Sequence, residues 1–279
     1  MEYININGKI VPANEPVLLA SNRGYRYGDG LFETMKVVGE QVSLVPFHFE
    51  RLFSSLSVLQ FDVPKLFTAE KLQQEVMQLC QRNNCTSLAR VRLSVSRGNG
   101  GLYDADKTLQ YLIECWPLPE LVNRLNENGL VIDIYPDARK SCDKFSSIKS
   151  ANFLPYSLAA HYAKANKYND CLVLNTQGSI ADSTIANVFI IKEEVITTPA
   201  LTEGCVNGVM RRHLIGGLKK GGYFIRESAV SIDDLLAADE VFLSNAIQGI
   251  RWVRQCRDST YRNSKTVEIF TRFVKTISS

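Results

Sequence analysis

The chain has 279 residues, 45% of them hydrophobic and 22% charged, which is enough to bury a sizeable core in one large or two ordinary domains. Its net charge of +3 is too small to indicate nucleic acid or a membrane surface, so we expect small molecules or protein chains as partners. No apolar run reaches about 18 residues, and the acidic, alternating start at residues 1–10 is unlike a signal peptide, so we expect a soluble cytoplasmic protein.

The seven cysteines are scattered singly along the chain, odd in number and without a C-x-x-C pair. This spacing indicates free thiols and a reducing compartment, and it argues against structural zinc. The three histidines, His48, His161 and His213, lie far apart in the sequence on predicted helices, so we expect no metal site and no hydrolase chemistry from them.

The first part of the chain has the pattern of a small sheet with two helices. Residues 1–45 alternate apolar and polar side chains in short runs, which predicts antiparallel strands. Helical patterns follow at 46–60 and 68–82, the first opened by a proline and the second capped by a threonine. Two strand-like runs, at 88–96 and 108–116, then return to the sheet.

The segment Pro-Leu-Pro-Glu at 117–120 is the best linker signal in the chain, because two prolines stiffen it and the composition changes afterwards. We therefore predict a small N-terminal α/β domain at 1–116 and a larger C-terminal domain at 121–279, a mixed α+β fold class. The elements predicted for the larger domain are a strand at 129–135, a helix at 153–166, strands at 171–174 and 187–192, a helix at 206–220, a strand at 223–227, a helix at 231–238, a strand at 240–244 and a helix at 264–277.

Two features of the N-terminal part are candidates for chemistry. Residues 23–34 pack three glycines, an aspartate and three aromatics, and Gly-Asp-Gly before an apolar strand predicts a tight turn. Taken alone, this pattern favours a purely structural turn. Arg51 stands beside an apolar stripe on the helix predicted at 46–60, where an arginine is either a salt-bridge partner or a planar fork for a phosphate.

Three features of the C-terminal part add to these. Asp182 and Asn187 lie in a small-residue loop before a strong strand. The stretch 198–212 is a loop rich in threonine and glycine that runs into a helix, whose start offers unpaired N–H groups and a positive dipole end to a phosphate. Ser244 and Asn245 end the strand predicted at 240–244. Each feature is weak alone, and their order along the chain carries the signal.

Lys149 lies in the stretch DKFSSIKSANF at 143–153, and most lysines in polar surroundings are solvated surface residues. Together with the Gly-Asp-Gly turn, the helix arginine and the helix start NGVMRR, however, this stretch forms an order of motifs. That order resembles the class IV (fold type IV) pyridoxal-phosphate enzymes. These are the branched-chain aminotransferases, the D-amino acid aminotransferases and the 4-amino-4-deoxychorismate lyases. The resemblance extends from INGKIV to SNAIQGI, and it implies a C-terminal pseudo-barrel domain that carries the lysine, in a homodimer.

The resemblance also implies roles for individual residues. Lys149 would form a Schiff base with pyridoxal 5'-phosphate and move a proton at the substrate Cα. Asp182 stands where most relatives carry glutamate, whose carboxylate keeps the ring nitrogen protonated, and it is one methylene shorter. Relatives commonly have threonine at Met210, so Ser244 or Asn245 would replace the lost hydroxyl. The expected cofactor site is Arg51, Asp182, Asn187, Gly208, Val209, Met210, Ser244 and Asn245.

The substrate carboxylate is expected to meet an arginine. Arg90 and Arg92 lie on one predicted strand and would face the same side, with Leu93 facing the other. With Arg97 just after the same strand, this is either an exposed sheet face balanced by acids, or one of these three arginines, or Arg26, binds the substrate carboxylate. Thr34 could hydrogen-bond a carboxylate or a leaving group. The tentative substrate residues are Arg26, Phe32, Thr34, Arg90 and Arg92.

The segments YGDGLFET and SRGNGGLY look more like the lyases than the branched-chain enzymes, whereas RGY and IKSANFL look like the D-amino acid aminotransferases. We favour 4-amino-4-deoxychorismate lyase, which releases pyruvate and 4-aminobenzoate for folate synthesis. The alternative is a branched-chain or D-amino acid transaminase, and fold alone does not separate the two. A remote alternative is a catalytically idle binding protein of the same fold, which the departures at Asp182 and Met210 motivate.

Overall fold

The computed structural model describes residues 1–104 and 108–277, so the last three residues of the glycine-rich loop 97–107 lie outside the described part. The chain divides into two compact units. Unit 1 comprises Met1–Glu120 together with Lys149–Asn152, and unit 2 comprises Leu121–Ile148 and Phe153–Ser279. Residues 149–152 were predicted to belong to the C-terminal domain, whereas they group with unit 1 because their backbone pairs with one of its strands.

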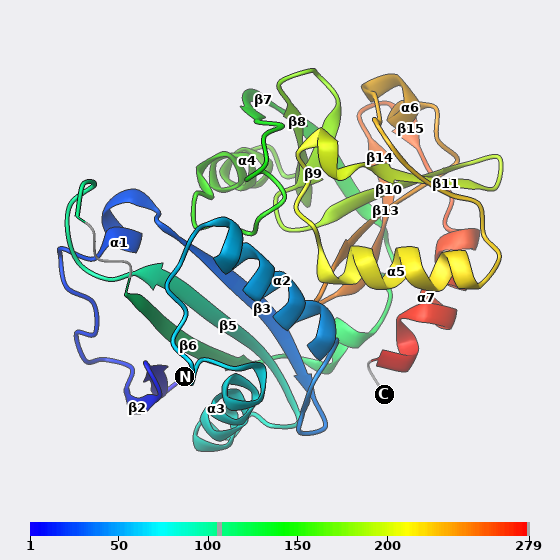
Figure 1. Cartoon of the computed structure of the whole chain (residues 1–279). Coiled ribbons are helices and arrows are strands. Elements are labelled where there is room, and N and C mark those ends of the chain that lie inside the picture. Colours follow the sequence, from blue (N-terminus) through cyan, green and yellow to red (C-terminus); the bar gives the residue numbers. More distant parts are fainter. Residues whose placement is uncertain (105–107, 278–279) are drawn as a thin grey trace. The chain divides into compact units, whose positions relative to one another are not determined.

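Unit 1 is built on a six-stranded antiparallel sheet in the order β2-β1-β6-β5-β3-β4 (Figure 1). The strands are β1 (Tyr3–Ile6), β2 (Lys9–Pro12), β3 (Gly30–Val38), β4 (Gln41–Val42), β5 (Leu88–Arg97) and β6 (Leu109–Pro117). The helices are α1 (Arg23–Tyr27), α2 (Val45–Val58) and α3 (Ala69–Arg82). The helices predicted at 46–60 and 68–82, and the strands predicted at 88–96 and 108–116, are therefore confirmed.

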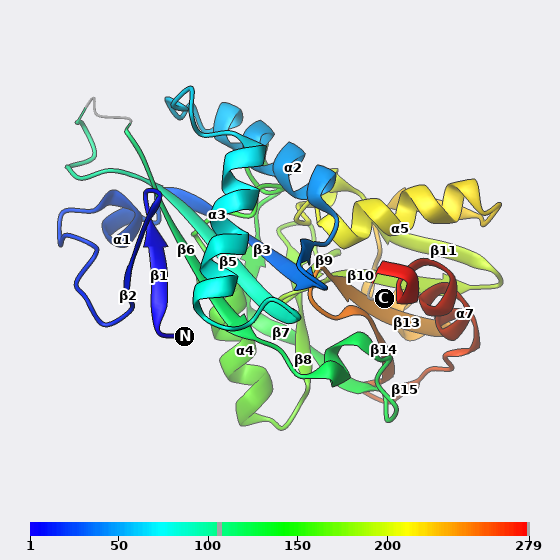
Figure 2. The same cartoon turned by 90° about the horizontal axis from the view of Figure 1, so that it is seen from below.

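Period-two alternation gives this sheet one buried and one partly polar face. On β5, Val91 and Leu93 are buried while Arg90 is exposed and Arg92 half-buried, as side chains of successive strand residues must point to opposite faces. Both α2 and α3 cover the buried face (Figures 1 and 2). Their apolar stripes, which include Leu52 and Leu79, supply the other half of the core.

The segment predicted as a Gly-Asp-Gly turn also holds a short helix that sequence analysis missed. The side chain of Asn22 caps α1 by accepting from the backbone of Tyr25, and Gly28 ends the helix with a left-handed φ of 64°. A Cβ on Gly28 would lie 2.3 Å from Asn152 Oδ1. This glycine is thus needed twice, for its backbone conformation and for the close approach of the segment 149–152.

Unit 2 is built on a nine-stranded mixed sheet in the order β12-β11-β10-β13-β14-β7-β8-β9, with β15 beside β14. Its strands are β7 (Leu130–Lys140), β8 (Asp170–Asn175), β9 (Ile180–Ser183), β10 (Asn187–Lys192), β11 (Val195–Pro199), β12 (Ile225–Ser228), β13 (Glu240–Asn245), β14 (Gly249–Cys256) and β15 (Ser259–Thr260). Its helices are α4 (Leu154–Ala165), α5 (Val209–Lys220), α6 (Ile232–Leu236) and α7 (Ser264–Phe273).

The unit 2 sheet curls around its own core, as the pseudo-barrel expectation requires. Side chains from six different strands meet in one buried cluster, for example Ile132, Leu172, Val188, Val241 and Val253. Both α5 and α7 pack beside β13 (Figures 1 and 2). Among the described residues, no helix is both long and apolar enough to cross a membrane.

Several boundaries in unit 2 differ from the prediction. The helix predicted from residue 206 begins at Val209, because the backbone N–H of Val206 binds Asp182 and that of Asn207 binds the carbonyl of Ser147. Strands β9, β11, β14 and β15 were not predicted, and the strand predicted at 223–227 begins at Ile225. Short strands such as β9 owe their extended conformation to partners distant in the sequence, which a local pattern does not contain.

Candidate active site

Lys149 is held in place by main-chain pairing with β3. Ser150 forms an antiparallel bridge with Leu31. On either side of it, Phe32 N donates to the carbonyl of Lys149 at 3.0 Å, and Ala151 N donates to the carbonyl of Gly30 at 2.9 Å. The lysine therefore lies next to an isolated β-bridge on β3, and its carbonyl is hydrogen-bonded to that strand, which fixes its backbone more firmly than a surface loop would.

The side chain of Phe32 lies between two cations. The Nζ of Lys149 is 4.5 Å from the centroid of its ring, and the guanidinium carbon of Arg92 is 3.7 Å from the same centroid. Both distances are within cation–π range. Phe32 is buried, so it joins the lysine to the sheet and keeps a second positive charge close to it.

The strand register brings most of the predicted substrate residues to one face of the sheet. In the pairing of β3 with β5, Phe32 lies opposite Ser94 and Thr34 lies opposite Arg92. Arg90 is two residues from Arg92 and faces the same side, as predicted. These residues therefore share the face that carries Phe32, the partner of Lys149.

Arg26 does not share this face. It is exposed in the last turn of α1, and its Nε donates to the backbone carbonyl of Ala20 at 2.9 Å. The acid that balances the arginines is Glu114, directly opposite Arg92 on β6. Burial raises the pKa of Glu114, while Arg92 and Arg90 act in the opposite direction. Glu114 thus balances the arginines on this face of the sheet, and the same face still offers Arg90 and Arg92 as candidates for binding the substrate carboxylate.

The opposite face of β3 carries a buried charged cluster that sequence analysis missed in part. Arg51 Nε donates to Glu33 Oε1 at 2.7 Å, and Arg51 Nη2 donates to Oε2 at 2.6 Å. The Nδ1 of His48 lies 2.6 Å from the same Oε2. Two nitrogens of the arginine fork predicted for a phosphate are thus engaged by a carboxylate. The overlooked signal was Glu33 itself, a charged residue at an inward position of an apolar strand.

The charge states in this cluster follow from burial and proximity. Burial by itself raises the pKa of Glu33, but Arg51 and His48 outweigh it and bring the pKa from 4.5 to about 2. Burial lowers the pKa of His48, and the charges of Arg51 and Lys149 lower it further against the pull of Glu33. The histidine is therefore neutral at pH 7, and Glu33 with Arg51 forms the ion pair.

Replacing Glu33 with glutamine is expected to lower the free energy of unfolding by about 3–5 kcal/mol at pH 7, because the guanidinium of Arg51 would stay buried without its counter-charge. Denaturant unfolding of wild type and variant measures this. Since the pKa of Glu33 is lowered, its contribution is complete above pH 4.5 and is lost as the pH falls toward about 2.

The difference in the free energy of unfolding between wild type and the Glu33→Gln variant should accordingly become smaller as the pH is lowered from 4.5 to about 2. Glu50→Gln is the matched control, since Glu50 is exposed on the same helix as Arg51 and should change stability by less than about 0.5 kcal/mol. A variant at Glu33 as stable as this control would show that the pair adds nothing.

In unit 2, Asp182 is the centre of a second buried polar network. Its Oδ2 accepts from Tyr156 OH at 2.8 Å and from Val206 N at 2.9 Å, and it lies 3.2 Å from Lys140 Nζ. Its Oδ1 accepts from Asn187 Nδ2 at 2.8 Å. The loop before α5 therefore lies within hydrogen-bond distance of the Asp182 carboxylate. With one donor among the described residues, Oδ1 can accept a second.

Asn187 connects this network to the start of α5. Its Nδ2 also donates to the carbonyl of Val206 at 2.8 Å, and a Cβ on Gly208 would lie only 1.9 Å from its Oδ1. Gly208 is the N-cap of α5 and offers no side chain to the helix start. The N–H groups of the first turn, including those of Val209 and Met210, are therefore not capped by a side chain.

Replacing Gly208 with alanine is expected to weaken cofactor binding at least about tenfold, because the new methyl group would collide with Asn187 and displace the helix start. Titration of the apoprotein with cofactor, followed by absorbance, measures this. The control is Gly216→Ala on the same helix, where a Cβ meets nothing within 4 Å. Equal cofactor affinities in the two variants would show that the close contact between Gly208 and Asn187 is not needed for cofactor binding.

Ser244 and Asn245, the two candidates for the missing hydroxyl contact, face different sides of the sheet. Ser244 pairs with Asn187 in the register of β13 and β10, so the two share a face. Its Oγ is buried and has no hydrogen-bond partner among the described residues. Asn245 instead forms the turn into β14, with its Oδ1 accepting from the backbone of Gln248 at 2.8 Å.

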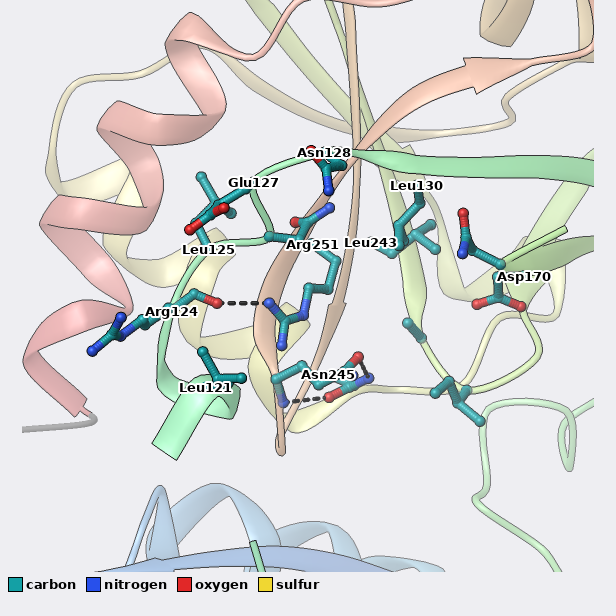
Figure 3. A pocket seen from close by; sticks show the side chains of 15 residues that line it. Leu121, Arg124, Leu125, Glu127, Asn128, Leu130, Asp170, Leu243, Asn245 and Arg251 are labelled. Carbon is teal, nitrogen blue, oxygen red and sulfur yellow. Dashed lines mark hydrogen bonds between the residues drawn. The ribbon is translucent and has the colours of Figure 1, made fainter. Parts of the chain in front are cut away.

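Asn245 lines a cavity of about 520 Å³ at the end of β13 (Figure 3). Gln248 and Arg251 contribute to its wall from the turn and from β14. Arg251 Nη1 donates to the carbonyl of Arg124 at 2.6 Å, which ties the segment after the linker to the sheet. Because Ser244 is absent from this lining, the cavity and the Asp182 network belong to opposite sides of the sheet.

The residues present fit the pyridoxal phosphate that the resemblance implies. The orphaned hydroxyl of Ser244 and the uncapped start of α5 are donors suited to a phosphate. The remaining acceptor capacity of Asp182 suits a protonated ring nitrogen. In unit 1, the buried Nε2 of His48 likewise has no hydrogen-bond partner among the described residues. Tyr156 and Lys140, which orient Asp182, carried no sequence signal beyond being polar residues near Lys149.

Comparison with known proteins agrees with this geometry. The family model for class IV amino-transferases matches residues 30–256. The protein named "Putative branched-chain-amino-acid aminotransferase" from Methanocaldococcus jannaschii is 30% identical over 95% of this chain and 92% of its own. Aminodeoxychorismate lyase from Bacillus subtilis is 30% identical over 88% of this chain and 83% of its own. The PLP-bound structure of a hypothetical aminotransferase from Mycobacterium tuberculosis superposes with a TM-score of 0.84 at 19% identity, covering 99% and 98% of the two chains.

Proposed function

The chain belongs to the class IV aminotransferase family, and from that premise we propose that it is a 4-amino-4-deoxychorismate lyase, which forms pyruvate and 4-aminobenzoate. It is an enzyme, and the cofactor of its family is pyridoxal 5'-phosphate. We further propose that it acts as a homodimer in the cytoplasm, in folate synthesis. The seven cysteines, all free, support a reducing location.

One observation carries the choice of substrate. Lys149 and Arg92 flank the same phenylalanine ring, and Thr34 and Arg90 lie on the same face of the sheet. Aminodeoxychorismate carries two carboxylates, one on its ring and one on its enolpyruvyl group, and so needs more than one cation or hydroxyl. A branched-chain side chain would instead need an apolar wall. The polar, cationic face supports the lyase substrate.

In this proposal each residue has a defined task. When bound, the cofactor withdraws electrons from the carbon that carries the substrate amine. Lys149 takes the proton from that carbon, and the bond between the neighbouring ring carbon and the enolpyruvyl oxygen breaks as the ring becomes aromatic. The released enolpyruvate takes up one proton and becomes pyruvate. Asp182 keeps a proton on the ring nitrogen, and Tyr156 and Asn187 hold its carboxylate in position. Arg92 and Thr34 orient the substrate carboxylates.

The phosphate is assigned to the start of α5 and Ser244. The N–H groups of Val209 and Met210 and the hydroxyl of Ser244 would donate to it, and Gly208 keeps the helix start open. Arg51 is kept as a proposed phosphate residue on the family resemblance alone, since two nitrogens of its fork donate to Glu33. The substrate roles of Arg26 and the cofactor role of Asn245 receive less support from the geometry, since Arg26 binds backbone carbonyls and Asn245 shapes a turn.

The second candidate function is a branched-chain or D-amino acid transaminase. It is favoured by the M. jannaschii relative. Its match covers 95% of this chain and 92% of its own, against 88% and 83% for the B. subtilis lyase. In a transaminase the proton that Lys149 removes is delivered to the cofactor instead of accompanying the loss of a leaving group. Both reactions use the same lysine, so the chemistry of the lysine does not separate them.

The deciding experiment measures both reactions on the same enzyme. Pyruvate release from 4-amino-4-deoxychorismate is followed beside amino transfer from L-leucine, L-valine and D-alanine to 2-oxoglutarate. We expect kcat/KM for pyruvate release to exceed kcat/KM for each amino-transfer reaction by at least about 10³-fold. Faster amino transfer would refute the lyase in favour of the transaminase. Uptake of the cofactor without either reaction would identify the idle binding protein.

A further inference from the structure

Three cysteines that are scattered in the sequence meet inside unit 1. Cys80 lies near the end of α3, Cys85 lies in the loop that follows, and Cys115 lies on β6. Their sulfur atoms all lie within 4.8 Å of one another, and Cys85 Sγ is 3.6 Å from Cys115 Sγ. All three side chains are buried, with Cys80 and Cys115 completely inaccessible.

The local backbone holds these thiols together. Cys85 N donates to the carbonyl of Cys80 at 2.9 Å, which closes the turn after α3. Asn83, the C-cap of α3, donates from its Nδ2 to Cys115 Sγ at 3.2 Å. The Oδ1 of Asn83 accepts from the backbone N–H groups of Glu2 and Tyr3, at 2.8 Å and 3.0 Å. The cluster is therefore built into the junction of α3, β1 and β6.

The geometry fits three sulfurs around one ion. At a metal-to-sulfur length of about 2.3 Å, three ligands in a trigonal plane lie about 4.0 Å apart, which agrees with the spacing of these thiols. The donors are all soft, and soft thiolates select ions such as Cu(I). Zinc needs four ligands in a buried site, and no fourth cysteine, histidine or carboxylate joins this group among the residues that the structure describes.

We propose that Cys80, Cys85 and Cys115 form a binding site for a soft cation of low coordination number, of the Cu(I) class. Each sulfur that binds as a thiolate gives its proton to solvent, and the single positive charge of the ion offsets one negative charge, so the remaining ligands bind with least cost as neutral thiols. The site lies in unit 1 and uses no residue of the proposed active site. It is independent of which reaction the enzyme catalyses.

The test is a titration of the cofactor-loaded protein with Cu(I) under anaerobic, reducing conditions, against a chromophoric chelator that competes for the ion. Wild type is expected to take up about one ion per chain. Cys85→Ala, which changes the most accessible of the three, and Cys115→Ser should each bind Cu(I) at least about 100-fold more weakly. Cys256→Ala is the matched control, an equally buried cysteine in unit 2 that should leave binding unchanged.

A second measurement uses wild type alone and does not depend on how the variants fold. Partial denaturation in the presence of Cu(I), followed by alkylation and peptide mapping, should show protection of Cys80, Cys85 and Cys115 and no protection of Cys171 or Cys256. Protection of other cysteines, no stoichiometric uptake, or Zn²⁺ binding as tight as Cu(I) would each overturn the proposal. So would recovery of a Cys85–Cys115 disulfide from protein that takes up no Cu(I).

Discussion

Replacing Lys149 with alanine is expected to reduce kcat by at least about 10⁴-fold, whichever reaction the enzyme catalyses. The lysine is the group assigned both to hold the cofactor and to move the substrate proton, and its Nζ lies 4.5 Å from the centroid of the Phe32 ring. The visible absorption band of the lysine-bound cofactor should disappear in the same variant. Steady-state rates and absorbance spectra of the purified proteins measure the two effects.

Two controls separate chemistry from structure in this experiment. Lys144→Ala removes an exposed lysine from the same stretch and should leave the rate and the spectrum unchanged. Lys149→Arg keeps the positive charge beside Phe32 but not the nucleophilic amine, so it should be as inactive as alanine while the fold is retained. Turnover of Lys149→Ala within tenfold of wild type would show that another residue is the base.

The second large effect is expected at Asp182. Asparagine at this position would remove the negative charge and would point an N–H₂ group at some of the four donors that now surround the carboxylate. We expect the proton-transfer step to slow by roughly 10²- to 10⁴-fold, because the ring nitrogen of the cofactor would lose the partner that keeps it protonated. Single-turnover kinetics on cofactor-saturated enzyme isolate this step from binding.

Tyr156→Phe is the control for the hydrogen-bond network. It deletes one donor to Asp182 but keeps the carboxylate, so the rate should fall by less than about tenfold. Asp182→Glu restores the residue that most relatives are expected to carry and should retain most of the activity if the loop at Val206 can move outward. If Asp182→Asn reacts as fast as wild type, a different group serves the ring nitrogen.

The candidate site was predictable to very different degrees at different residues. Lys149 and Asp182 were proposed because the order of motifs along the chain resembles a known family, although each residue is ordinary by itself. Tyr156 and Lys140 were not found, because their role is to donate to Asp182 and that contact joins residues 26 and 42 positions apart. Arg51 was identified as an important arginine, but its partner Glu33 follows only from the packing of α2 on β3.

The fold shows the same division between long and short elements. Segments with a strong periodic pattern, such as α2, α3, β5 and β6, were predicted with nearly correct bounds. Their alternation of apolar and polar side chains can be recognised from neighbouring residues in the sequence. The start of α5 was predicted three residues too early, because the N–H of Val206 is captured by Asp182 from another strand. The short strand β9 depends on pairing with β8 and had no periodic signal of its own.

The sequence by itself determined the α+β fold class and the family, and it led to the proposal that Lys149 is the reactive residue. Hydrophobic periodicity and the order of motifs can both be recognised from the amino-acid sequence alone. Only the tertiary structure decided that Lys149 pairs with β3, that Glu33 engages Arg51, that Ser244 and not Asn245 shares a face with Asn187, and that three separate cysteines form one cluster. The physical reason is that strand register and helix packing join residues far apart in sequence, and local patterns contain no information about which distant partner each will meet.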